Sequence, residues 1–122
     1  ICGEDVKLTF VPHLVPMVRG IHATLYVECI KDFEVYDIFE SFYEDEPFVD
    51  VMPANMSPNT KSVRASNFCR ISFHKETDSN RLIIFSVIDN LMKGAAGQAI
   101  QNMNIVMDWP EASGISFVPI TP

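Results

Sequence analysis

The segment PHLVPMVRG, residues 12–20, places a histidine and an arginine in a stretch braced by two prolines and ended by a glycine. Histidine titrates near neutral pH and can transfer protons, so His13 is a candidate for acid-base chemistry. The guanidinium of Arg19 can form paired hydrogen bonds with a carboxylate or a phosphate. The alternative is a bend at a sheet edge that carries a surface histidine and a solvated arginine.

The segment DNLMKGAAGQAIQNMN, residues 89–104, predicts a helix whose first turns are nearly bare of side chains. Gly94 and Gly97 would each cost about 1 kcal/mol relative to alanine inside a helix. Small residues allow close packing against another backbone. They would equally admit the edge of a ligand or cofactor at the helix start, with Asn90 and Lys93 pointing to it. The glycines come too late for a dinucleotide fingerprint, which needs them in the strand-to-helix turn.

The polar loop SPNTKSVRASNFC offers hydroxyl, amide and cationic groups that could bind an anionic substrate, although polar loops often have this composition for solvation alone. The groups are Ser57, Thr60, Lys61, Ser62, Arg64, Ser66 and Asn67.

The three cysteines, Cys2, Cys29 and Cys69, are widely spaced and form no CxxC pair. They also form no metal-binding pattern with the three histidines. We therefore expect no metal site, and thiols kept reduced in a cytoplasmic protein.

The hydrophobic pattern predicts five strands and two helices. The strands are expected at residues 6–15, 21–30, 48–51, 68–73 and 82–87, and the helices from an Asp32 cap to Pro47 and from an Asp89 cap to about Met103. The last two strands are joined by a short polar turn and should form an antiparallel hairpin. We expect an α+β fold with a mixed, largely antiparallel sheet and helices on one face.

A length of 122 residues suits one domain, and the net charge of −7 disfavours nucleic acid and anionic membranes as partners. No apolar run approaches the ~20 residues that span a bilayer. The sequence begins at Ile1 without an initiator methionine, so we expect a piece of a longer protein.

Four segments, in order, resemble the C-terminal part of the N-acetyl-gamma-glutamyl-phosphate reductase family. They are FVPHLVPMVRGIHATLYV, SVRASNFCRI, VIDNLMKGAAGQAIQNMNIV and PEASGI. The resemblance implies a fold similar to the C-terminal domain of glyceraldehyde-3-phosphate dehydrogenase. It makes residues 1–122 one substrate and dimerisation domain of a two-domain enzyme of arginine biosynthesis.

The family reduces an acyl phosphate to N-acetylglutamate semialdehyde with NADPH, through a thioester on a cysteine. The resemblance therefore implies NADP as cofactor, the protein's own Rossmann domain as a partner, and a homodimer or homotetramer. The family's GxGxxG turn and its GCYPT-like cysteine segment are absent from this sequence, so this chain alone should not catalyse the reaction.

Transferred by position, the resemblance makes Arg19, Ser66 and Asn67 candidate substrate-binding residues, with Arg19 clamping a phosphate or carboxylate. His13 becomes a candidate for proton transfer or substrate orientation. Asn90, Lys93 and Gly94 become candidates for contact with the cofactor, where the helix returns to the Rossmann domain. Ala65 stands where the family usually has glycine.

Two alternatives remain open at this stage. One is a domain of the related aspartate-semialdehyde dehydrogenases, which catalyse the same type of reaction on another substrate. The other is a non-catalytic dimerisation module that retains only the fold.

Overall fold

The computed structural model describes residues 7–53 and 56–120. Its core is a four-stranded sheet with the order β1-β4-β3-β2. The strands are β1 (Ile21–Glu28), β2 (Val49–Val51), β3 (Cys69–Lys75) and β4 (Arg81–Ile88). The helical elements are α1 (Val35–Tyr43), the 3₁₀ turn η1 (Thr60–Val63), the π-helical turn η2 (Met92–Ala96) and α2 (Gly97–Val106).

The sheet is mixed. Strand β4 pairs antiparallel with both β1 and β3, and β2 pairs parallel with β3. The predicted hairpin is therefore confirmed, and the apolar strand at 82–87 is central as part of β4. The α+β prediction is confirmed as well.

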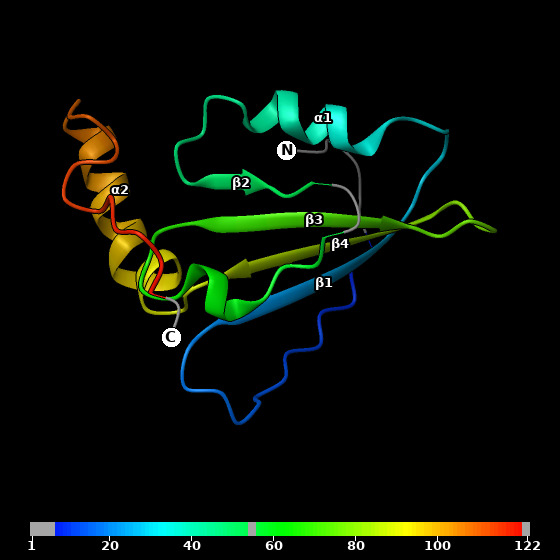
Figure 1. Cartoon of the computed structure of the whole chain (residues 1–122), viewed down its shortest axis with the longest axis horizontal. Coiled ribbons are helices and arrows are strands. Elements are labelled where there is room, and N and C mark those ends of the chain that lie inside the picture. The colour runs from blue at the N-terminus through cyan, green and yellow to red at the C-terminus, as the bar shows by residue number, and fades with distance from the viewer. Residues whose placement is uncertain (1–6, 54–55, 121–122) are drawn as a thin grey trace.

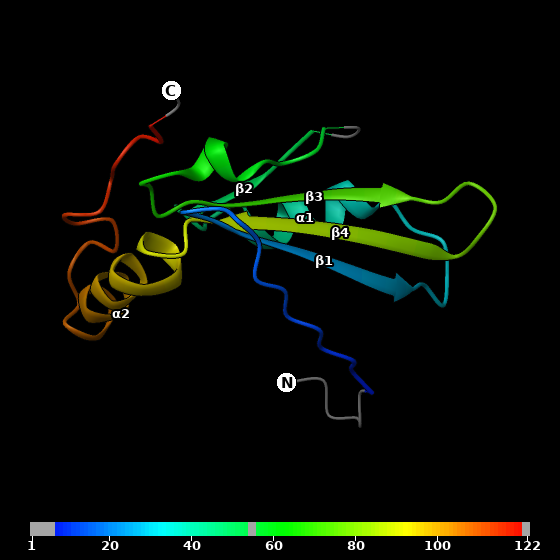
Figure 2. The same cartoon turned by 90° about the horizontal axis from the view of Figure 1, so that it is seen from below.

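Both helices begin on the same face of the sheet. Phe39 of α1 packs against Phe73 of β3, with ring centroids 4.4 Å apart and the ring planes tilted by 52°. Gly94 of η2 lies next to the side chains of Ile21 and Ile88, which share that face with Phe73. Figure 2 shows α1 behind the sheet and α2 beyond its end.

The predicted first strand is wrong over the described residues 7–15, which form extended chain outside the sheet (Figures 1 and 2). Its alternating apolar residues lie in the open: Leu8 and Phe10 are each 80% exposed. Alternation predicts that one side of a strand is covered, but within the described residues no neighbouring strand pairs with this segment. Val6 lies outside the described residues.

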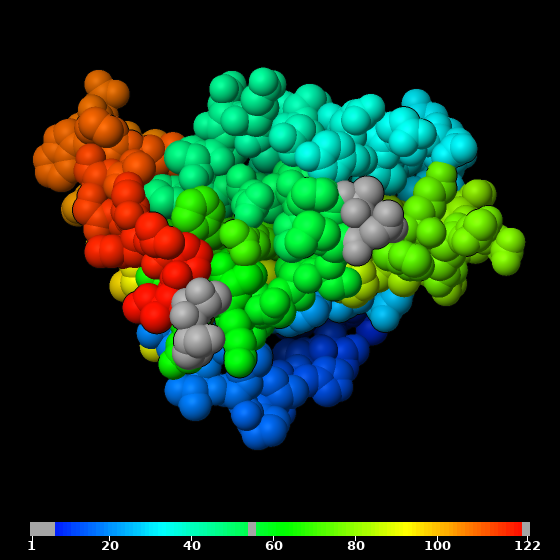
Figure 3. Space-filling view, viewed as in Figure 1, coloured from blue at the N-terminus to red at the C-terminus, as the bar shows by residue number. Residues whose placement is uncertain are grey.

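Helix α1 starts later than predicted. Its N-cap is Glu34 and not Asp32, whose carboxylate forms an ion pair with Lys75 instead. The C-terminal segment at residues 110–120 is irregular and lies over the loop around Arg64, to which Ile120 donates a backbone hydrogen bond (Figure 3).

The buried core is small. It consists of Phe48, Met52, Val63, Ile71, Leu82, Val87 and Ile115. Many apolar side chains remain exposed on β1 and α2.

Candidate functional site

Arg19, Asn67, Asn90 and Lys93 come together at one end of the sheet, where β4 ends and η2 begins (Figure 1). Three segments meet there: the end of the N-terminal arm at residues 19–20, the loop at residues 64–67, and η2 with the start of α2.

Asp89 joins these three segments. It is fully buried, and its carboxylate accepts hydrogen bonds from Arg19 Nη2 at 2.9 Å and from the backbone N–H of Ala65 at 2.7 Å. It also accepts from the N–H groups of Leu91 and Met92 at the helix start, as a capping residue does. Burial alone would raise the pKa of Asp89, but these donors together lower it to about 2.

Arg19 is bound to Asp89 at close range. Its Nη2 lies 2.7 Å from Asp89 Oδ2, and a quarter of the arginine side chain is exposed. Its Nε is buried and has no hydrogen-bond partner within the described residues. The guanidinium is therefore held in a fixed position with part of its donor set unused.

Asn90 and Gly20 add a second connection between the arm and the helix start. The Asn90 side-chain oxygen accepts a hydrogen bond from the Gly20 N–H at 2.7 Å. Gly20 has a φ of 118°, and a Cβ at that position would lie 2.5 Å from Thr60 Cβ. Only glycine lets the arm turn into β1 here.

Ala65 has a φ of 61°, a left-handed conformation that favours glycine. This geometry explains why glycine is expected at the position. It also directs the Ala65 N–H toward Asp89.

A second cluster lies beside the first, along the inner side of η2 and α2. Gln101 Oε1 accepts hydrogen bonds from Lys93 Nζ and from Asn67 Nδ2, both at 2.8 Å. Gln101 Nε2 donates to the carboxylate of Glu111 in the C-terminal segment. The Lys93 ammonium also lies 5.7 Å from the centre of the Phe48 ring.

Gly94 and Gly97 differ in burial and in the space around them. Gly97 is buried, and a Cβ there would lie 2.3 Å from Asn67 Oδ1, so this glycine serves packing inside the domain. Gly94 is exposed, and its nearest neighbours would be 3.4 Å or more from a Cβ. Gly94 and the small residues Ala95, Ala96 and Ala99 are therefore the exposed part of this stretch.

The remaining predicted residues do not reach the exposed part of the site. Ser66 is fully buried and donates its hydroxyl hydrogen to Val63 O at 2.7 Å. Asn67 is fully buried. His13 is exposed on the arm, where its ring pairs with Val11 O, and it hydrogen-bonds to neither cluster.

Asp89, Gln101 and Glu111 are not among the site residues that the sequence predicts. Asp89 was expected only as a helix cap, and Glu111 only as part of PEASGI. The buried face of α2 consists of Gly97, Gln101 and Asn104, whereas Leu91, Ile100 and Met103 are partly exposed. The sequence shows that Gly97, Gln101 and Asn104 share one face of the helix, but the burial of that face is seen only in the structure.

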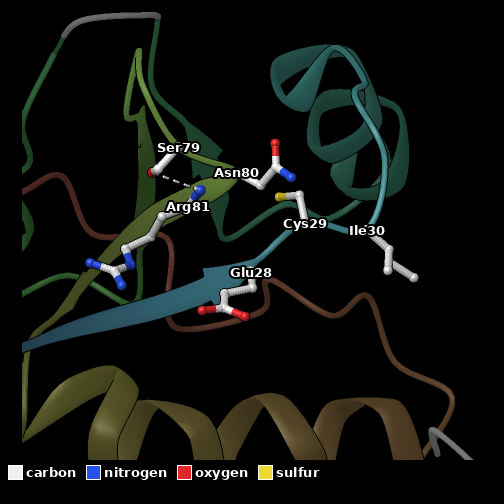
Figure 4. A pocket seen from close by; sticks show the side chains of 6 residues that line it. All are labelled: Glu28, Cys29, Ile30, Ser79, Asn80 and Arg81. Carbon is white, nitrogen blue, oxygen red and sulfur yellow. Dashed lines mark hydrogen bonds between the residues drawn. The ribbon is translucent and has the colours of Figure 1, made fainter.

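The opposite end of the sheet has a hollow of about 450 Å³ beside the β3-β4 hairpin (Figure 4). It is lined by Glu28, Cys29, Ile30, Ser79, Asn80 and Arg81, and it contains none of the predicted site residues.

Over residues 7–53 and 56–120, no three histidine, cysteine or acidic side chains are grouped so that they could hold a metal ion. No helix in that part of the chain is long and apolar enough to cross a membrane.

The fold and this site define an α+β domain with a mixed sheet, in which Asp89 holds the Arg19 guanidinium close to the start of η2. The family model described as semialdehyde dehydrogenase, dimerisation domain, matches residues 1–90, and the chain belongs to that family.

Curated relatives match nearly the whole chain. N-acetyl-gamma-glutamyl-phosphate reductases from Nitrosomonas eutropha and Laribacter hongkongensis are each 55% identical, over 98% and 100% of this chain. The protein of that name from Pseudomonas fluorescens is 52% identical over 98% of the chain. The chain covers only 35–36% of the length of these relatives.

Proposed function

We propose that this chain is the substrate and dimerisation domain of an NADP-dependent N-acetyl-gamma-glutamyl-phosphate reductase. The whole enzyme would reduce N-acetylglutamyl 5-phosphate to N-acetylglutamate 5-semialdehyde and phosphate, in the cytoplasm, as a step of arginine biosynthesis. The observation that carries the proposal is the identity of more than half of the residues to reductases of this name across nearly the full chain.

The site offers a physical role for Arg19. The substrate carries a phosphate and a carboxylate, and a guanidinium binds either through parallel N–H groups. Asp89 fixes the guanidinium before the substrate arrives, so little side-chain entropy is lost on binding. Arg19 would therefore orient the substrate while the acyl group is transferred to a cysteine outside these 122 residues. His13 would join it as a proton-transfer or substrate-orienting group from the same arm.

Ser66 and Asn67 would act from beneath the substrate. Both are buried, and Ser66 sits in the loop whose Ala65 N–H donates to Asp89. In this proposal they shape the loop that carries the substrate pocket.

The cofactor side of the site would be the start of η2. Gly94, Ala95 and Ala96 are exposed and small, so an aromatic ring system could lie against them, and Asn90 and Lys93 are close to them in sequence. NADPH, when bound, supplies the hydride that releases the aldehyde. The protein's Rossmann domain would hold most of the cofactor, and the residues named here would only border it.

Oligomerisation follows from the same proposal. The family model describes a dimerisation domain, and strand β1 is an edge strand with Ile21, Leu25 and Tyr26 each at least 45% exposed. A homodimer or homotetramer would bury such a surface.

The decisive experiment uses the full-length protein with Arg19→Ala and Arg19→Lys. Arg70→Ala is the matched control, because Arg70 also forms an ion pair at 2.7 Å, with Asp50. We expect Arg19→Ala to raise the KM for the acyl phosphate roughly tenfold or more, which corresponds to the loss of about 1.4 kcal/mol of binding. Arg19→Lys should have a smaller effect, since it keeps a charge beside Asp89. The KM for NADPH should not change.

A KM for the acyl phosphate that is equal in Arg19→Ala, Arg70→Ala and the unmodified enzyme would remove Arg19 from the site. Assaying aspartyl phosphate alongside N-acetylglutamyl phosphate separates the two semialdehyde dehydrogenase activities. A folded full-length protein that reduces neither compound would favour the non-catalytic dimerisation module.

A further inference from the structure

Gln101 lies between a group that can only accept hydrogen bonds and a group that can only donate them. The ionised Glu111 carboxylate is an acceptor, and the Lys93 ammonium is a donor. A side-chain amide satisfies both only if its NH₂ faces Glu111 and its oxygen faces Lys93. The orientation of Gln101 is therefore determined by its two charged neighbours.

The orientation of Asn67 follows from that of Gln101. Gln101 Oε1 is an acceptor, so Asn67 must present its NH₂ to it, at 2.8 Å. The Asn67 oxygen then faces Gly97 and has no hydrogen-bond partner within the described residues. An unpaired buried oxygen is costly, and its presence indicates that the bond to Gln101 decides the orientation.

Lys93 depends on this arrangement because it is partly buried. Burial lowers the pKa of Lys93, and Cys69 of β3, Glu111 of the C-terminal segment and Glu46 after α1 act in the opposite direction. Of these three groups, Glu111 is the one connected to Lys93 through a shared hydrogen-bond partner.

We propose that Glu111 is a positioning residue which, by orienting Gln101, holds the side chain of Lys93 in η2 in place as a charged ammonium. Glu111 acts on Lys93 from the C-terminal segment, both through its charge and through the hydrogen bonds of Gln101. The consequence for catalysis rests on the proposed function, in which Lys93 borders the cofactor.

The test measures the ionisation of Lys93 directly, in the full-length protein labelled with ¹³C at lysine Cε. The Lys93 signal is assigned by its disappearance in Lys93→Met, and its shift is followed against pH. In Glu111→Gln, Gln101 can adopt either orientation and one negative charge is lost, so we expect the titration midpoint of Lys93 to move to lower pH. Glu111→Asp retains the charge and should lie between Glu111→Gln and the unmodified protein.

Glu28→Gln is the control for the change in net charge. Glu28 is exposed and lies at the other end of β1, paired in register with Arg81. Glu28→Gln should leave the titration midpoint of Lys93 unchanged. Equal midpoints in Glu111→Gln and the unmodified protein would overturn the proposal, even if Glu111→Gln unfolds at a lower temperature.

The kinetic test is separate. If Lys93 borders the cofactor, Glu111→Gln should raise the KM for NADPH and move the alkaline limb of kcat/KM to lower pH. A full-length protein without reductase activity would defeat the proposed function, while the titration of Lys93 would still decide the role of Glu111.

Discussion

The two ends of the sheet each carry an ion pair, and the two pairs differ in what surrounds them. At the η2 end, Asp89 is fully buried and joins three segments of the chain. At the hairpin end, the Asp32 side chain is 87% exposed and contacts Lys75 on the surface. A buried charge must be compensated by its neighbours, whereas an exposed one is solvated. This contrast indicates that the η2 end is the part of the domain that has to be rigid.

Removing the buried carboxylate should have the largest effect. Asp89→Asn leaves the Arg19 guanidinium without its counter-charge and weakens the hydrogen bonds to three backbone N–H groups. Breaking one partner of such a pair costs about 3 kcal/mol or more. We expect hydrogen exchange in residues 86–106 of the full-length protein to become at least tenfold faster.

Asp32→Asn is the comparison for that measurement and should leave exchange in the same peptides unchanged. Similar acceleration by both substitutions would show that burial does not distinguish the two ends.

The pH dependence of stability tests the role of the buried Asp89 carboxylate. The pKa of Asp89 lies at about 2, below its ordinary value of 3.8, so its stabilising contribution is present above pH 3.8 and disappears as the pH falls toward 2. The expected loss is about 2 kcal/mol. Unfolding of the full-length protein between about pH 5 and pH 2 should therefore depend less on pH in Asp89→Asn. An identical pH dependence in both proteins would exclude Asp89 as the source.

A buried glycine, Gly97, and an exposed glycine, Gly94, lie three residues apart, and substituting them should change stability in opposite directions. Gly97→Ala places a methyl group 2.3 Å from Asn67 Oδ1 and 3.0 Å from the Met92 backbone, and overpacking of this kind costs about 1–3 kcal/mol. Gly94→Ala meets no atom closer than 3.4 Å and should be neutral or stabilising by up to about 1 kcal/mol. Urea unfolding of the two variants checks the opposite signs, and equal destabilisation would contradict the assigned roles.

The smallest effect is expected at Ala65. Its left-handed backbone costs an alanine about 1 kcal/mol, so Ala65→Gly should stabilise the loop by up to that amount. Slower hydrogen exchange in residues 60–68 would support the prediction. Faster exchange would mean that glycine's extra freedom in the unfolded chain outweighs the relief of strain.

The sequence was sufficient for the elements that follow simple periodicity. Strands β1, β3 and β4 and the Asp89 cap were predicted because β-branched runs and a capping aspartate act locally. At residues 7–15 the sequence predicts a strand that the structure does not contain, because an apolar alternation does not say what covers it. The starting point of α1 was also missed, because Asp32 pairs with a lysine that is distant in sequence.

The site was predictable only in part. Arg19 and Lys93 were selected by residue type, and the structure brings them to the same end of the sheet. Their partners Asp89, Gln101 and Glu111 are connected to them by tertiary contacts that no local pattern records. The inward positions of Ser66 and Asn67 likewise depend on how the loop packs, which composition does not specify.

We propose that this domain belongs to a reductase in which the η2 end of the sheet binds the acyl phosphate, and this claim can be tested directly. The most direct measurement is the NADP-linked, phosphate-dependent oxidation of N-acetylglutamate semialdehyde by the full-length protein, with Arg19→Ala and Lys75→Ala assayed side by side. We predict activity in the unmodified protein and a strong loss of activity at limiting substrate in Arg19→Ala. Lys75→Ala should be as active as the unmodified protein. Equal activity in all three proteins would contradict the claim.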